Sequence, residues 1–236
     1  MNVLNKSLEN IESLIEYLRN KGDNYIFRGC TCKDYVLSPS AYRDCLNDDI
    51  PDILYYAERE HNALLNVIKK FVNKENYFYA YYYGQHYGFK TRLLDFSWDP
   101  LVALVFACAE WSPTNIEKTK DIDGILYVLD SKKYKKLDLN NYEDLGNLLV
   151  CHGDNISKHG DVDLSVVNFI DPNKDVKRLK NQEGCFLLFP QITEEIYEIK
   201  NEDCDEIIII PAKLKEEILK YIREKYDITL DKLQEI

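Results

Sequence analysis

The stretch YGQHYGFKTRLLDFSWDPLVALVFACAE, residues 83–110, decides how this chain is organised. Its first half combines two glycines with a dense set of polar side chains, namely His86, Lys90, Thr91, Arg92, Asp95 and Asp99. Its second half is apolar and has the character of a buried helix. Because buried polar groups must be hydrogen-bonded and buried charges paired, the stretch is either a satisfied internal network or the wall of a site.

The chain has 236 residues, which favours one domain over the range 1–236. Within it we expect an N-terminal helix in residues 1–22 and a C-terminal helical segment in residues 212–236. Hydrophobic residues make up 45% and charged residues 30%, the balance of a globular protein and not of a disordered or fibrous one.

Charge and cysteine content restrict the class of protein further. The net charge of −11 argues against a dedicated nucleic-acid surface, although a local basic cleft stays open. Seven cysteines, an odd number, several of them in apolar runs, suit reduced thiols. The chain shows no signal-peptide pattern and no run of eighteen apolar residues. We therefore expect a cytoplasmic protein that does not span or bind a membrane.

Hydrophobic periodicity predicts helices first and strands later. Helices are expected at residues 8–20 after Ser7, at 53–73, from Pro100 after Asp99 or Ser97, and at 212–226. Strands are expected at residues 25–29, 124–130, 165–170, 185–190 and 206–211. Residues 77–84 are compatible with a strand or with a half-buried helix. This order predicts an α+β fold, with a mixed or antiparallel sheet and helices packed around it.

The common nucleotide-binding, metalloprotease and serine-hydrolase motifs are missing from the chain. Cys30 and Cys32 lack a second pair at zinc spacing, and the four histidines show no ligand pattern. We expect no metal at the site.

Individual polar residues leave two interpretations open. Arg28, between large apolar residues and Gly29, suits a buried ion pair or a phosphate clamp. His86 is either simply hydrogen-bonded or an acid, a base or an orienting donor. Arg92 and Asp95 would pair in a helix, at positions i and i+3, or would meet a ligand from a loop.

A basic segment, Lys177 to Lys180, enters an apolar strand through Gln182, Glu183 and Gly184. This segment could supply ligand contacts. Glu183 has the position of an acidic catalytic residue, although an exposed loop carboxylate is the commoner outcome.

Four blocks together resemble one family. They are FRG at residues 27–29, LSPSAYR at 37–43, QHYGFKTRLLDFSWDPLVALVFA at 85–107 and RLKNQEGCFLLFP at 178–190. Their order and spacing resemble the FRG-domain family of bacteria and their phages. The resemblance implies a stand-alone FRG domain. The aromatic-Arg-Gly strand also looks like the opening of the arginine-containing ADP-ribosyltransferases, which implies an ADP-ribosyltransferase-like fold.

That similarity implies a nucleotide-handling enzyme, with NAD as its substrate, that transfers ADP-ribose to a protein or nucleic-acid acceptor or cleaves NAD, in a phage-defence or toxin setting. The implied catalytic candidates are Glu183, Asp95 and His86. The implied ligand-binding candidates are Arg28, Gln85, Thr91, Arg92 and Gln182. The Ser-Thr-Ser strand and Glu-x-Glu turn of the transferases are absent here. The rival hypothesis is a binding module without turnover that recognises a nucleotide, a nucleic-acid end or a partner protein.

Overall fold

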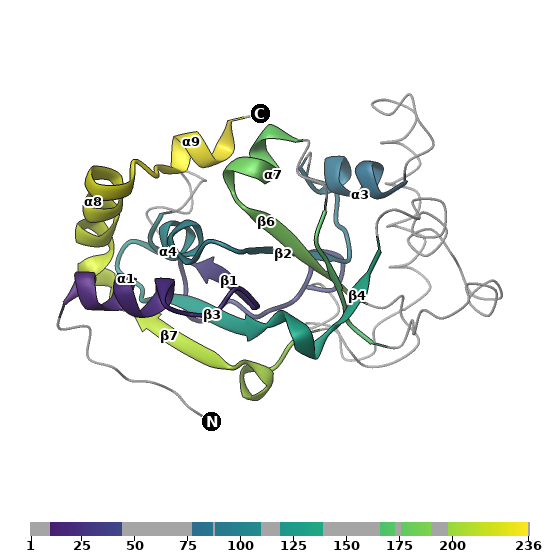
Figure 1. Cartoon of the computed structure of the whole chain (residues 1–236), viewed down its shortest axis with the longest axis horizontal. Helices are drawn as coiled ribbons and strands as arrows, with labels where there is room; N and C mark the ends of the chain where they lie inside the picture. Colours follow the sequence, from purple (N-terminus) through teal and green to yellow (C-terminus); the bar gives the residue numbers. More distant parts are fainter. Residues whose placement is uncertain are drawn as a thin grey trace.

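The computed structural model describes residues 10–43, 77–86, 88–109, 119–138, 166–172, 176–189 and 198–235. In these ranges one mixed sheet has the strand order β4-β5-β6-β2-β1-β3-β7 (Figure 1). The strands are β1 Tyr25–Cys30, β2 Leu93–Ser97, β3 Gly124–Asp130, β4 Lys135–Leu137, β5 Asn168–Ile170, β6 Gly184–Leu188 and β7 Glu206–Ile210. Neighbouring strands are antiparallel except β4 and β5, which are parallel.

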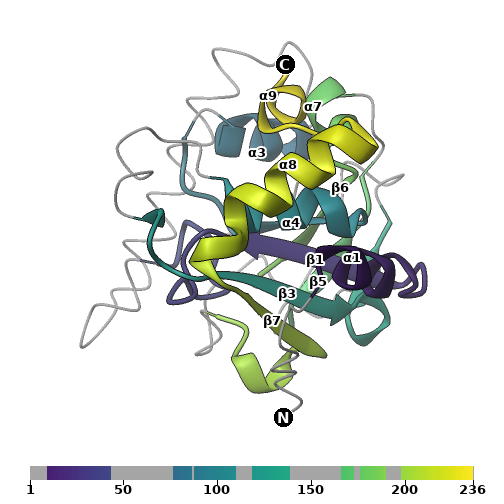
Figure 2. The same cartoon turned by 90° about the vertical axis from the view of Figure 1, so that its left-hand side faces the viewer.

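Helices flank this sheet. The α-helices are α1 Ile11–Arg19, α3 Tyr77–His86, α4 Pro100–Cys108, α7 Lys177–Asn181, α8 Lys215–Tyr226 and α9 Leu230–Gln234. Single 3₁₀ turns are η2 Ser131–Lys133, η4 Asn201–Asp203 and η5 Ala212–Leu214. Helix α4 lies against β1, and α1, α8 and α9 pack on α4. Figure 2 shows α8 crossing in front of α4.

The architecture confirms the predicted α+β class. The strand expected at residues 124–130 is β3, with the same bounds, and Pro211 follows β7 as predicted. The helix after Asp99 is also confirmed, because the Asp99 side chain accepts a hydrogen bond from the Leu101 amide (2.7 Å). Residues 77–84 belong to helix α3, one of the two structures that the sequence left open.

Other boundaries differ from the prediction. Helix α1 begins at Ile11, because Asn10 is its N-cap and accepts from the Glu12 amide; Ser7 lies outside the described residues. The C-terminal helix opens with the 3₁₀ turn η5. Elements β2, β4 and α7 were not foreseen, because three to five residues are too few for a periodic pattern, whereas α9 lies within the helical segment expected at residues 212–236. The helix predicted at residues 53–73 lies outside the described ranges.

The strands alternate their side chains between two apolar cores. On the face covered by α4, the core joins sheet residues to the helices, including Phe27, Leu126, Val128, Ile208 and Ile210. On the opposite face, sheet residues pack with the segment after β1, including Ile26, Leu94, Phe96, Leu187 and Tyr42.

Helix α4 touches the sheet backbone at two glycines. A Cβ atom on Gly29 would lie 1.8 Å from the Ala103 carbonyl oxygen, and one on Gly124 would lie 2.2 Å from the Ala107 carbonyl oxygen. No other residue type fits either position without separating helix from sheet. The glycine of the Phe-Arg-Gly motif is therefore a packing requirement.

We expect Gly29→Ala to destabilise the fold by about 3 kcal/mol or more, because overpacking against backbone cannot be relieved by a rotamer change. Urea unfolding of the variant measures this. Gly22→Ala is the matched control, since a Cβ there meets nothing within 4 Å. Equal free energies of unfolding for the two variants would show that α4 moves aside at little cost.

Candidate functional site

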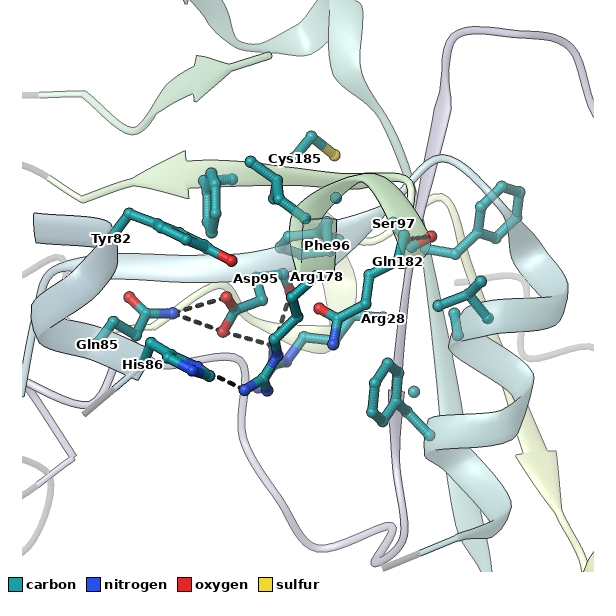
Figure 3. Close-up of a pocket in the computed structure, with 18 residues that line it drawn as sticks. Arg28, Tyr82, Gln85, His86, Asp95, Phe96, Ser97, Arg178, Gln182 and Cys185 are labelled. Atoms are coloured by element: carbon teal, nitrogen blue, oxygen red, sulfur yellow. Dashed lines mark hydrogen bonds and ion pairs between the residues drawn. The ribbon is translucent and has the colours of Figure 1, made fainter. Parts of the chain in front are cut away.

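A pocket of about 290 Å³ lies where α3, α4 and α7 meet the strands β1, β2 and β6 (Figure 3). Its polar lining comes from both halves of the chain, and its apolar lining comes mainly from the sheet and α4. The lining residues are Phe27, Arg28, Gly29, Tyr82, Gln85, His86, Asp95, Phe96, Ser97, Val102, Ala103, Phe106, Arg178, Leu179, Gln182, Gly184, Cys185 and Phe186.

Arg28 joins two strands beside this pocket. Strands β1 and β2 pair at Phe27 and Ser97. Next to that pair, Arg28 Nη1 donates to the main-chain oxygen of Asp95 (2.6 Å), so a side chain satisfies a strand carbonyl. The Asp95 carboxylate is 3.8 Å from the same nitrogen. Arg28 Nε is buried and has no hydrogen-bond partner in the described part of the chain.

The Asp95 carboxylate is oriented by a chain of hydrogen bonds from neutral side chains. Gln85 Nε2 donates to both carboxylate oxygens, each at 2.7 Å. The Gln85 carbonyl in turn accepts from the Thr91 hydroxyl (2.5 Å), and the Thr91 amide donates to Ser40 Oγ. The Thr91 contact sets which end of the Gln85 amide faces Asp95. The carboxylate is therefore oriented while its side chain stays 56% exposed.

His86 and Arg178 connect α3 to α7. Arg178 Nη1 lies 2.5 Å from His86 Nδ1. An arginine can only donate, so Nδ1 is the acceptor and the neutral ring carries its proton on Nε2. Burial, together with the positive charge of Arg178, lowers the pKa of His86 from its ordinary value. The pair thus consists of one cation and one neutral ring near pH 7.

The other wall of the pocket is apolar. Phe27, Val102 and Phe106 face it from β1 and α4, and Tyr82 and Phe186 pack edge to face (5.8 Å between ring centroids). Burial raises the pKa of Tyr82 to about 12, so its phenol is neutral.

The pocket has an excess of positive charge, although the chain as a whole is acidic. The net charge is −11, yet the lining contains two guanidinium groups, Arg28 and Arg178, and one carboxylate, Asp95. Arg43 adds a cation nearby: burial, and then the positive charge of Arg28, lower its pKa. For Arg178, the described residues offer a neutral imidazole and no carboxylate. This arrangement favours an anionic ligand.

The structure brings five of the eight predicted site residues together, namely Arg28, Gln85, His86, Asp95 and Gln182. Arg28 and Asp95 are far apart in sequence and adjacent in space. Thr91 is buried and does not line the pocket; it positions Gln85 instead.

The predicted convergence of Arg92 with this site is wrong. Arg92 precedes strand β2, so it points to the opposite side of the sheet from Asp95, three residues later. It is 2% exposed, and its Nη1 donates to the Phe189 carbonyl (3.3 Å). The helical pairing of Arg92 with Asp95 is excluded for the same reason.

Glu183 is not among the lining residues either. It occupies the turn between α7 and β6 with a φ of 45°, a left-handed conformation, and its side chain is exposed. This backbone directs its neighbours Gln182 and Gly184 to the pocket and leaves Glu183 outside.

Sequence reasoning missed Arg178, Tyr82 and the apolar wall. Arg178 belongs to the basic segment noted above, and its spacing of four residues from Gln182 would have placed both on one helix face. The apolar wall had no signal, because Phe27 and Phe106 look like ordinary core residues. Among the residues the structure describes, no three His, Cys, Asp or Glu side chains form a metal-binding group. Nor is any described helix long and apolar enough to cross a membrane.

Residues 23–115 match the family model of the FRG domain. The match includes β1, α3, β2 and α4, and so most of the pocket, and it supports the FRG family for this chain. The block at residues 178–190, which contributes Arg178 and Gln182, lies beyond it. No curated protein and no solved structure matches the chain.

We expect the pKa of His86, followed by NMR in the whole chain, to lie below 6.5 and to rise in Arg178→Ala, part of the way only because burial remains. Lys180→Ala, which removes an exposed cation from the same helix, should leave it unchanged. Since folding favours the neutral ring, stability should fall as pH decreases through 6.5. An unchanged pKa of His86 in Arg178→Ala would contradict the contact between the two side chains.

Proposed function

We propose that this protein binds a nucleotide in the pocket between α3, α4 and α7, with NAD as the first candidate. The observation that carries the proposal is the pairing of Arg28 and Arg178 with an aromatic wall inside an acidic chain. Guanidinium groups recognise phosphate oxygens through paired donors. Flat apolar walls suit a heterocycle.

The size of the pocket limits what it encloses. Sites for drug-sized ligands have volumes of roughly 300–1,000 Å³, and this one has about 290 Å³. A heterocycle with its ribose fits that space, whereas the second half of a dinucleotide would extend outside. A mononucleotide, or one half of NAD, is therefore the part that the pocket holds.

Calorimetric titration with ADP and with NAD tests the binding. Arg178→Ala should weaken it about 10- to 100-fold, the effect of losing one charge-assisted contact. Lys177→Ala is the matched control: it removes a neighbouring cation of α7 whose ammonium pairs with Glu235 at the surface. Arg28→Ala should weaken binding too, but it also removes the bond to the Asp95 carbonyl, so its unfolding must be measured beside it. Equal affinity in Arg178→Ala and Lys177→Ala would refute the proposed site.

We further propose that Asp95 takes the catalytic carboxylate role if the pocket turns over NAD. In that reaction the bond between ribose C1′ and the nicotinamide nitrogen breaks, and its electron pair leaves with nicotinamide. The Asp95 carboxylate would stabilise the cationic ribose. Water or an acceptor group then bonds to C1′ and gives up its proton to the solvent. What supports Asp95 over Glu183 is its place in the lining, beside Arg28 and His86.

Release of nicotinamide from NAD distinguishes the two carboxylates. Asp95→Asn should abolish release while ADP and NAD still bind, because the guanidinium groups remain. Glu183→Gln should release nicotinamide at the rate of the unchanged protein. The opposite pattern would give the role to Glu183. Binding with no release from the unchanged protein, with protein and nucleic-acid acceptors supplied, favours the binding module without turnover.

A further inference from the structure

Gln182, which lines the pocket at the end of α7, is hydrogen-bonded to the C-terminal helix α9. Gln182 follows α7 and donates its Nε2 to the main-chain oxygen of Leu233 in α9 (2.9 Å). Its neighbour Asn181 makes a similar bond from Nδ2 to the Lys232 oxygen (3.0 Å). Both amides attach α9 to α7, but only Gln182 lines the pocket.

The bond to Leu233 determines which end of the Gln182 amide a ligand meets. With Nε2 engaged by a carbonyl, the amide cannot turn over without losing that bond and bringing two oxygens together. Its Oε1 is then the acceptor available to the pocket, while Nε2 keeps a second hydrogen. No donor for Oε1 occurs in the described part of the chain, and Figure 3 shows the side chain extending into the site. Gln182 is thus an oriented acceptor.

Ser97, which also lines the pocket, already has hydrogen-bond partners. Ser97 Oγ donates to the Gln182 main-chain oxygen (2.7 Å) and accepts from the Asp99 amide (3.0 Å). Arg178 lies one helical turn before Gln182, on the same face. A ligand whose phosphate meets Arg178 and whose heterocycle lies in the pocket would therefore be within reach of Gln182 Oε1.

We infer that Gln182 is a specificity residue that selects a ligand bearing an N–H₂ donor on its heterocycle. This inference rests on the proposed nucleotide binding. Two sources supply that chemistry, the 6-amino group of adenine and the carboxamide of nicotinamide. A ligand with oxygen in place of that amine would direct an acceptor at Oε1, and the fixed amide could not adapt.

Paired titrations test the inference and separate the two sources. ADP is compared with IDP, in which oxygen replaces the 6-amino group, and NAD with its nicotinic-acid analogue. The unchanged protein should prefer the amine-bearing member of one pair on the order of tenfold. Preference in the first pair assigns adenine to the pocket, and preference in the second assigns nicotinamide.

In Gln182→Leu, the ratio of the two affinities within that pair should be close to one. Asn181→Leu is the matched control, since it removes a comparable bond to α9 at a position outside the pocket and should keep the preference. If the nucleotides bind without preference in either pair, or if Asn181→Leu loses it equally, the inference about Gln182 fails and the binding proposal stands. If none of the four ligands binds, the proposed function fails and the inference with it.

Discussion

The contact between helix α4 and the sheet backbone is the constraint on which the rest of the structure depends. Gly29 and Gly124 let the carbonyls of Ala103 and Ala107 approach β1 and β3 at distances that exclude any side chain. The small residues of α4 and the two glycines are therefore one feature, although they come from three separate parts of the chain. Helices α1, α8 and α9 then pack on α4 and complete the apolar core of that face.

The same contact builds the pocket. With α4 close to β1, Val102, Ala103 and Phe106 become its apolar wall, and Arg28, next to Gly29 in sequence, comes to the polar side. The FRG tripeptide thus contributes three different things: a core aromatic ring, a guanidinium group and a packing glycine. A motif that joins two packing residues to a polar residue lining a pocket is difficult to interpret from sequence, since a structural role and a ligand-binding role both explain its residues.

The polar side of the pocket depends on neutral partners. Gln85 and Thr91 orient Asp95, and His86 accepts from Arg178 without cancelling its charge. A carboxylate in place of His86 would neutralise Arg178 and remove the local excess of positive charge. A neutral imidazole accepts a hydrogen bond from the guanidinium group and so orients it, while its positive charge is kept in an acidic chain.

Sequence patterns predicted the elements whose signals are local: the strand at 124–130, the Asp99-capped helix, and the strand that ends before Pro211. Arg28, His86 and Asp95 stood out in the sequence as polar residues beside glycines and apolar runs, whereas Gln85 and Gln182 were candidates implied by the family resemblance; all five line the pocket. Tertiary structure decided the rest. Whether Arg92 or Asp95 faces the pocket depends on the pleat of β2, and whether Glu183 or Gln182 does depends on one left-handed turn. Arg178 and Phe106 reach the site only because α7 and α4 are placed by contacts distant in sequence.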